Sequence, residues 1–398
     1  MKRDVADLAL TSLVATLAIQ IYTSFASSAP AVLAPVLAHD LDITPKWIGV
    51  FVGLVYAGAM TASLLCGTFI RRLGAIRISQ ICVLVSAAGI CALALLPAHA
   101  AGIAALVALL IGAGYGPITP ASSHILAQTT PAHRMSLVFS IKQTGVPAGA
   151  ALGGAILPAL ALAIGWRAAF IGAACIGIAV ALFAQPIRES LDADRQPGLP
   201  FSFAAISDSL SIVARSPQLS RLVAASFAYS AAQVSLISFL VVFLTESLGW
   251  TLVSAGLVLT LTTLAGVTGR IGWGALADRN HSPRRVLALI GLLAAAGMAM
   301  LALAKPSWPP VVVILVAIVS GASAIGWNGV QLAEVARHAP PGKTGAVTGA
   351  SGFITFFGVV VGPPTFAVIA GTAGGYPGAF ALLAVLALAG AAFAFHKS

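Results

Sequence analysis

The sequence predicts an all-α membrane protein with twelve transmembrane helices in two pseudo-symmetric halves of six helices each. Hydrophobic residues make up 59% of the 398 residues, and charged residues only 8%. A soluble domain carries about 25% charged residues, so this chain needs lipid as its outer solvent. The hydrophobic residues form long unbroken runs rich in Ala and Leu, whereas a membrane barrel would alternate apolar and polar residues in short segments.

Twelve stretches are apolar enough to span a bilayer, which takes about 20 residues. The first runs on from Leu8 to about Ala38 and is too long for a cleaved signal peptide, so we expect it to be a retained span. The predicted spans are 8–36, 47–70, 78–97, 101–128, 137–164, 168–187, 220–245, 252–275, 286–304, 309–335, 345–370 and 376–395.

The loops differ strongly in their content of Lys and Arg. The chain has 21 Lys and Arg residues. One set of loops holds only three of them, Lys46, Arg167 and Lys305. The other set of loops, together with both termini, holds 16, and the last two lie within spans. Cytoplasmic loops are the ones enriched in Lys and Arg. We therefore predict an inner-membrane protein with both termini in the cytoplasm, and assign the net charge of +10 to topology rather than to nucleic-acid binding.

One polar stretch divides the chain into an N-terminal half, 1–187, a cytoplasmic linker, 188–219, and a C-terminal half, 220–398. The linker holds four of the eleven acids, Glu189, Asp192, Asp194 and Asp208. Several residues recur about 210 positions later, such as Gln20 and Gln233 or Pro131 and Pro341. Parallel repeats of six spans are a known transporter architecture with the solute site between the halves.

The loops after spans two and eight resemble a motif of the major facilitator superfamily, G-x-x-x-D-R-x-G-R-[RK]. The second copy reads Gly274-Ala-Leu-Ala-Asp278-Arg279, with Arg284 and Arg285 beyond. The first copy reads Gly67-Thr-Phe-Ile-Arg71-Arg72-Leu-Gly74, so that Arg71 stands where the family has Asp. The resemblance implies the twelve-helix fold of that family. It also implies that Asp278, Arg279, Arg71 and Arg72 belong to a latch that closes the cytoplasmic side.

Two cations lie within predicted spans, where charges are rare and usually face the bundle interior. Lys142 is early in span five, and the alternative for it is snorkelling to the surface. Arg270 lies eight residues before Asp278 in span eight, about 12 Å along a helix. Its alternatives are an internal pair with Glu334 or a backbone carbonyl. The resemblance to organic-anion and nitrate porters implies that Arg270 binds an anion.

His124 in span four and Glu334 in span ten are 210 positions apart and lie near the cytoplasmic ends of their spans. A histidine titrates near neutral pH, so His124 is a candidate carrier of a coupling proton. The alternative for both residues is a structural charge network with the basic loops.

Further polar and aromatic residues are predicted to line a substrate site, although amides and hydroxyls also join helices to one another. Trp327 and Asn328 follow Gly326 in the middle of span ten, which makes them the strongest of these candidates. The remaining ones are Gln20, Tyr22, Gln143, Tyr229 and Gln233.

The sequence contains no phosphate-binding G-x-x-x-x-G-K-[ST] loop, no H-E-x-x-H motif and no His or Cys cluster spaced for a metal. We therefore expect no cofactor, no metal and no enzymatic activity. The cysteines Cys66, Cys82, Cys91 and Cys175 lie in apolar runs and are interpreted as small buried hydrophobes.

We predict a monomeric secondary transporter that moves a small organic anion, such as a carboxylate, by alternating access. Two cations within spans and no acid in span one fit an anion better than a cationic drug. Proton symport is a candidate, because a co-transported proton offsets the charge moved against the membrane potential, about 2.3 kcal/mol per charge per 100 mV.

Two other functions are kept open. A proton-coupled exporter of hydrophobic drugs is supported by the Gly-Pro pattern of span five, Gly145 to Gly149. It is opposed by Ala108, four residues before Gly112, where such exporters tend to carry Arg. A membrane sensor or scaffold would need a soluble signalling domain, and the sequence shows none.

Overall fold

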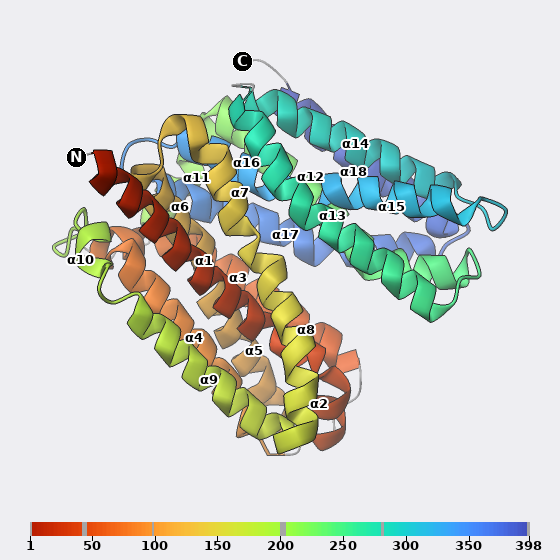
Figure 1. Ribbon diagram of the computed structural model, residues 1–398, viewed down its shortest axis with the longest axis horizontal. Helices are drawn as coiled ribbons and strands as arrows, with labels where there is room; N and C mark the ends of the chain where they lie inside the picture. Colours follow the sequence, from red (N-terminus) through yellow and green to blue (C-terminus); the bar gives the residue numbers. More distant parts are fainter. Residues whose placement is uncertain (1, 42–45, 98, 200–203, 280–281, 396–398) are drawn as a thin grey trace. The chain divides into compact units, whose positions relative to one another are not determined.

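The computed structural model describes residues 2–41, 46–97, 99–199, 204–279 and 282–395. Every regular element in these ranges is helical, and twelve helical stretches are long and apolar enough to cross a membrane, as predicted. The side chains of Lys2, Arg3 and Lys46, and the whole of Lys397, lie outside the described part. The chain forms two compact units (Figure 1). Unit 1 comprises Met1–Thr130, Lys142–Val213 and Ala339–Phe353, and unit 2 comprises Pro131–Ile141, Ala214–His338 and Ile354–Ser398.

Unit 1 contains the first four spans, most of the fifth and the sixth. Its helices are α1 Lys2–Val32, α2 Ala34–Asp40, α3 Lys46–Leu73, α4 Ala75–Ala94, α5 Ala101–Tyr115, α6 Ile118–Thr129, α8 Gly145–Ile164, α9 Trp166–Phe183, α10 Arg188–Leu191 and α11 Ala204–Arg215. The last two lie in the polar stretch that we predicted as a linker. The division into 1–187, 188–219 and 220–398 stays a prediction.

Unit 2 contains the remaining spans and the beginning of span five. Its helices are η1 Ala132–Arg134, α7 Met135–Gln143, α12 Pro217–Glu246, α13 Leu252–Arg279, α14 Pro283–Leu303, α15 Pro310–Ala324, α16 Asn328–His338, α17 Thr344–Ala370 and α18 Gly375–Phe395. The first ten residues of α17 belong to unit 1, and most of α7 belongs to unit 2. Unit 1 therefore includes the start of α17 from the C-terminal half of the sequence, and unit 2 includes the start of α7 from the N-terminal half.

Spans four and ten are each interrupted in the middle. Span four changes from α5 to α6 at Gly116 and Pro117, and span ten changes from α15 to α16 over Ile325, Gly326 and Trp327. Proline lacks an N–H and cannot continue the hydrogen-bond ladder. A broken span leaves backbone carbonyls at the end of its first half, where they can accept hydrogen bonds from side chains.

Helix pairings within unit 1 recur six spans later in unit 2. The pairs α3–α5, α4–α5 and α4–α9 correspond to α13–α15, α14–α15 and α14–α18. Glycines make close pairings possible, since a side chain on Gly112 of α5 would collide with the α3 backbone and one on Gly269 of α13 with the α15 backbone. The repeats that the sequence indicates thus correspond to equivalent packing in the two units.

An acid–aromatic hydrogen bond lies at the ends of the spans remote from the basic loops in each unit, between α2 and α9 in unit 1 and between α12 and α18 in unit 2. In unit 1 the Trp166 indole donates to Asp40 at 2.7 Å, and Arg167 donates to the same carboxylate at 3.2 Å. In unit 2 the Tyr376 hydroxyl donates to Glu246 at 2.8 Å. The hydrogen bonds from Trp166 and His39, together with the charge of Arg167, hold the pKa of Asp40 below its usual value.

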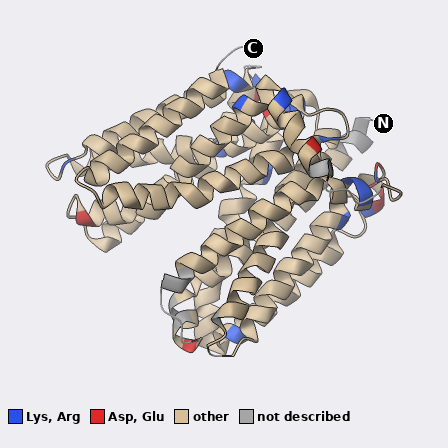
Figure 2. Cartoon of the chain, turned by 180° about the vertical axis from the view of Figure 1, so that it is seen from behind, with Lys and Arg blue, Asp and Glu red and all other residues tan. Residues whose placement is uncertain are grey.

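Most Lys, Arg, Asp and Glu residues lie at helix ends, as Figure 2 shows, and the helix bodies carry few of them. Large hydrophobic side chains are exposed along those bodies, such as Leu106, Leu257 and Val385. This is the distribution expected of helices whose outer faces contact lipid.

Candidate functional site

Lys142 lies inside unit 1 with only 2% of its surface exposed, so it does not snorkel to the surface. Its ammonium donates to the side-chain oxygen of Gln20 at 2.6 Å and to that of Gln143 at 3.1 Å. Gly145 brings α8 close to α1 at this level, since a Cβ there would be 3.0 Å from the side chain of Gln20. The structure thus brings together three of the predicted substrate residues.

Gln20 is fully buried, and its two polar atoms differ in their surroundings. The oxygen accepts from Lys142 and lies 3.5 Å from the Thr119 hydroxyl. The amide nitrogen has no hydrogen-bond partner among the described residues. Tyr22, two residues after Gln20 on α1, also has a buried hydroxyl without a hydrogen-bond partner among the described residues. A cation and a neutral donor therefore lie side by side in the interior of unit 1.

Arg270 lies inside unit 2 with 2% of its surface exposed. Its Nε–H donates at 2.9 Å to the carbonyl oxygen of Ile325, the residue that follows α15 at the break in span ten. Trp273, one turn further along α13, donates to Ala322 at 2.8 Å. A cation near the carboxyl end of a helix is favoured by the helix dipole. The sequence left two alternatives to substrate binding for Arg270, a backbone carbonyl and Glu334. The structure shows the bond to a backbone carbonyl, whereas Glu334 bonds to Arg337 and lies beside Arg284.

The other predicted residues of unit 2 form an aromatic–amide cluster on α12 and span ten. The Trp327 indole donates to Gln233 at 2.9 Å, and its ring lies 5.6 Å from that of Tyr229. The Tyr229 hydroxyl donates to the backbone of Leu287. Asn328, at the start of α16, has a side-chain oxygen without a partner in the described part. Tyr229 and Gln233 thus hold Trp327 in place beside the helix break.

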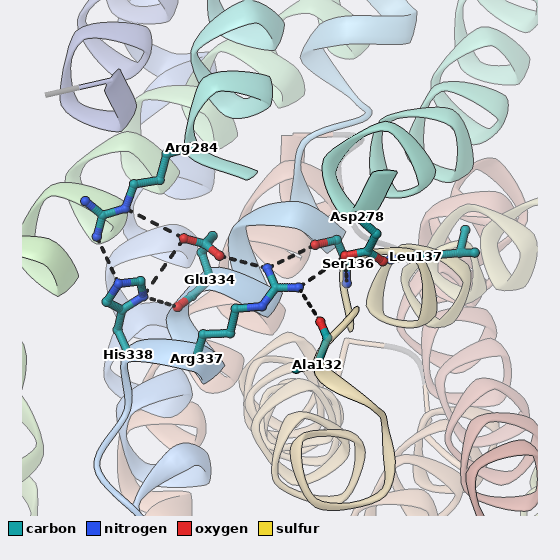
Figure 3. A network of polar contacts seen from close by, with 8 residues as sticks. All are labelled: Ala132, Ser136, Leu137, Asp278, Arg284, Glu334, Arg337 and His338. Carbon is teal, nitrogen blue, oxygen red and sulfur yellow. Dashed lines mark hydrogen bonds and ion pairs between the residues drawn. The ribbon is translucent and has the colours of Figure 1, made fainter. Parts of the chain in front are cut away.

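Asp278 at the end of α13 accepts two backbone hydrogen bonds from the start of α7 (Figure 3). The N–H groups of Ser136 and Leu137 donate to its two oxygens at 3.1 and 2.8 Å. A carboxylate at a helix N-terminus satisfies N–H groups that have no partner within the helix and complements the helix dipole. Gly274 adds a steric requirement, because a side chain there would collide with Ser140 of α7.

Arg337 on α16 joins Asp278, the α7 segment and Glu334 into one network, which the sequence analysis did not identify. Its guanidinium donates to Asp278 at 3.1 Å, to Glu334 at 2.8 Å and to the Ala132 carbonyl at 3.1 Å. Glu334 also lies 3.6 Å from Arg284, so it belongs to a charge network, one of the two predicted alternatives. A cavity of about 370 Å³ beside this network is lined by Ala132, His133, Ala277, Asp278, Pro283, Glu334 and Arg337.

The remaining predicted gating residues have different surroundings. His124 is 3% exposed, and its Nε2 lies 2.7 Å from a carboxylate oxygen of Asp194 in the polar stretch 188–219. Arg71 donates to the side chain of Gln196 at 3.3 Å. Arg72 is half-buried and Arg279 exposed, and neither makes a polar contact within the described ranges. Spacing along the sequence could not reveal Asp194 and Gln196 as partners, because both come from a polar stretch that has no counterpart in the repeats.

Within the described part of the chain, no group of three or more His, Cys, Asp and Glu residues is placed to hold a metal ion.

The chain was compared with protein families and with curated proteins. A model of the Major Facilitator Superfamily matches residues 14–363. Two Mycobacterium tuberculosis proteins, the Uncharacterized MFS-type transporters MT3072 (strain CDC 1551 / Oshkosh) and Rv2994 (strain ATCC 25618 / H37Rv), are each 26% identical to it over 284 residues. Each match covers 70% of this chain and 61% of the relative, so the chain matches less than two thirds of the length of these relatives.

Solved transporter structures share the fold at low sequence identity. The E. coli fucose:proton symporter FucP superposes with a TM-score of 0.77 at 18% identity, over 98% of this chain and 100% of that one. The human organic anion transporter MFSD10 (TETRAN) also gives 0.77 at 18% identity, over 97% and 99%. The match from residue 14 to residue 363 shows that the chain belongs to the Major Facilitator Superfamily, a family of secondary transporters that work by alternating access.

Proposed function

We propose that this transporter carries a small organic anion with a carboxylate group. The observation that carries the proposal is the pairing of the buried Lys142 ammonium with Gln20, whose amide nitrogen is a second donor beside it. A carboxylate has two oxygens that can accept from two such donors. A charge-assisted hydrogen bond is about twice as strong as a neutral one.

Arg270 is the second proposed anion ligand. Its bond to Ile325 fixes the plane of the guanidinium at the helix break, so that the group is oriented before a substrate arrives. The planar guanidinium matches a carboxylate in two parallel hydrogen bonds. The aromatic–amide cluster around Trp327 would contact the apolar part of the substrate. The proposal is supported by the fold that the chain shares with a human organic anion transporter.

The proposal is tested by ligand-induced stabilisation of the purified protein. A panel of small carboxylates is compared with the corresponding primary amides, which have the same shape and no charge. We expect one or more carboxylates to raise the melting temperature, because a ligand at 100 times its Kd stabilises a protein by about 2.7 kcal/mol. The matched amides should have no effect. Stabilisation by hydrophobic drugs alone would contradict the proposal and favour the exporter.

Proton symport is the proposed coupling. Uptake of a stabilising carboxylate into proteoliposomes should accelerate when the outside is made acidic and stop accelerating when an ionophore removes the proton gradient. Uptake that ignores the gradient would indicate transport without proton coupling and would leave the anion proposal intact.

The basic side of the protein is proposed to face the cytoplasm of an inner-membrane protein, since Lys and Arg collect in cytoplasmic loops. A reporter fused after Ser398 and a second one inserted near Arg195 should both read cytoplasmic. Reporters in the loops at Lys46, Arg167 and Lys305 should read periplasmic. A periplasmic signal near Arg195 would contradict the six-plus-six arrangement.

A further inference from the structure

Asp192, in the acidic segment that follows α10, is bonded to the start of α4. One carboxylate oxygen accepts the N–H of Ile76 at 2.7 Å, and the other accepts the N–H of Arg77 at 3.0 Å. Asp192 is fully buried. Gly74 makes the approach possible, since it has a φ of 97° and any side chain there would collide with Asp192. The carboxylate therefore acts as an N-terminal cap that comes from over 100 residues away.

Asp194 and Gln196 of the same segment hold two further helix ends. Asp194 accepts from Gln128 at 2.7 Å and lies 2.7 Å from His124, both on α6. Burial raises the pKa of Asp194, but the hydrogen bonds from Gln128 and His124 outweigh it, so the pKa lies below its usual value. The backbone N–H of Gln196 donates to the carbonyl of Arg71 at 2.7 Å, at the end of α3. The contacts of Asp192, Asp194 and Gln196 thus connect the ends of α4, α6 and α3 through one short segment.

The helix ends held in this way form the surface under the first turns of α17. A Cβ on Gly345 would be 3.0 Å from Ile70 of α3 and 3.6 Å from His124 of α6. One turn later, the Ser63 hydroxyl of α3 donates to the Gly349 carbonyl at 3.2 Å. The start of α17 therefore rests on α3 and α6, and a side chain at Gly349 would collide with the backbone of Ser63.

The equivalent helix start in unit 2 is fixed differently. There Asp278, a residue of the span-eight motif itself, caps α7. The corresponding position of the first motif holds Arg71. Among the described residues, no carboxylate accepts a hydrogen bond from the first turn of α17. Unit 1 thus lacks a direct acidic cap on α17 and instead uses linker acids to fix the helices beneath it.

We propose that Asp192, Asp194 and Gln196 form a linker clamp that restrains the opening of the transporter on its basic side. Alternating access requires the start of α17 to separate from α3 and α6 when that side opens. The clamp keeps the ends of α3, α4 and α6 in the positions that fit α17, so it stabilises the closed arrangement. Losing it shifts the population toward the open one. The inference does not depend on the identity of the solute.

Cys66 provides a native reporter for this opening. It lies on α3 with 2% of its surface exposed, and its sulfur would be 3.2 Å from a Cβ on Gly349 of α17. The test uses full-length protein in inside-out vesicles, with Cys82, Cys91 and Cys175 replaced by Ala. The measured quantity is the rate at which a membrane-impermeant maleimide modifies Cys66. In Asp194→Asn and Asp192→Asn we expect the rate to rise about fivefold or more, because each loses charged hydrogen bonds.

Glu189→Gln is the matched control, because Glu189 lies in the same segment, is exposed and makes no polar contact in the described part of the chain. It removes the same charge and should leave the rate at its wild-type value. His124→Gln is a second variant that keeps an N–H donor on α6 and should raise the rate less than Asp194→Asn does.

Three results would overturn the clamp. The first is a wild-type rate in Asp192→Asn, Asp194→Asn and His124→Gln. The second is an equal rise in Glu189→Gln, which would indicate a general effect of charge. The third is an equal rise for a protein with Cys82 as its only cysteine. Cys82 lies on α4 in the hydrophobic core of unit 1 and is 5% exposed, so its modification would report loosening of the whole unit.

Discussion

Replacing Arg270 with Ala is expected to reduce substrate uptake to below about one hundredth of the wild-type rate. Arg270 is proposed to bind the anion, and an anion that enters the site without its cationic partner loses several kcal/mol of interaction. Arg270→Lys is expected to be nearly as harmful. A Lys ammonium is a point charge, so it cannot donate to Ile325 and form two parallel bonds to a carboxylate at once. Initial uptake rates into proteoliposomes provide the measurement.

Lys142, the other proposed anion ligand, supplies the comparison. Lys142→Ala should also abolish uptake, while Lys142→Arg should retain part of it because a cation remains near Gln20. Monodisperse elution from a sizing column separates loss of binding from loss of folding. Unaltered uptake in Arg270→Ala would exclude its role, whatever the result at Lys142. If only Lys142 matters, we would expect a monovalent substrate rather than a divalent one.

Replacing Asp278 with Asn is expected to slow transport about tenfold while the affinity for substrate stays within a few-fold. The carboxylate accepts two backbone N–H groups of α7 and a bond from Arg337, and bonds to charged groups contribute about 1.5 to 3 kcal/mol each. Asn offers one oxygen and no charge, so the arrangement in which α7 rests on α13 becomes less stable. Because Asp278 lies about 12 Å along α13 from Arg270, binding should be spared.

A double-mutant cycle with Arg337→Gln tests whether the two residues act together. Residues in one hydrogen-bond network show effects that do not add. The double variant should therefore be about as slow as the slower single variant. Fully additive losses would show that Asp278 and Arg337 act independently. Transport at the wild-type rate in Asp278→Asn would show that Asp278 has no role in a latch.

The sequence predicts the twelve spans and the repeats because both depend on local properties. A span needs only length and apolar composition, so the stretches near Leu8 and Pro283 can be identified one at a time. Asp278 could be singled out because its motif is contiguous. Lys142 and Arg270 stood out because a charge within a span is costly wherever its partners lie.

The partners of these residues were decided by the tertiary structure. The contact between Lys142 and Gln20 joins residues 122 positions apart, and Arg337 meets Ser136 across 201 positions. The hydrophobic period of a helix does not specify which neighbour it meets, since in lipid helices associate through close packing and hydrogen bonds rather than through burial from water.

The sequence by itself therefore determined that the chain is a membrane protein of two related halves with cations inside its spans. Only the tertiary structure decided that Ile325 at a broken helix holds Arg270, that Arg337 joins Asp278 to Glu334, and that Asp192 and Asp194 of the polar stretch bond to α4 and α6. The physical reason is that composition and period set the solvent of a segment, whereas the partner of a polar group depends on three-dimensional proximity. Burial makes that partner obligatory without identifying it.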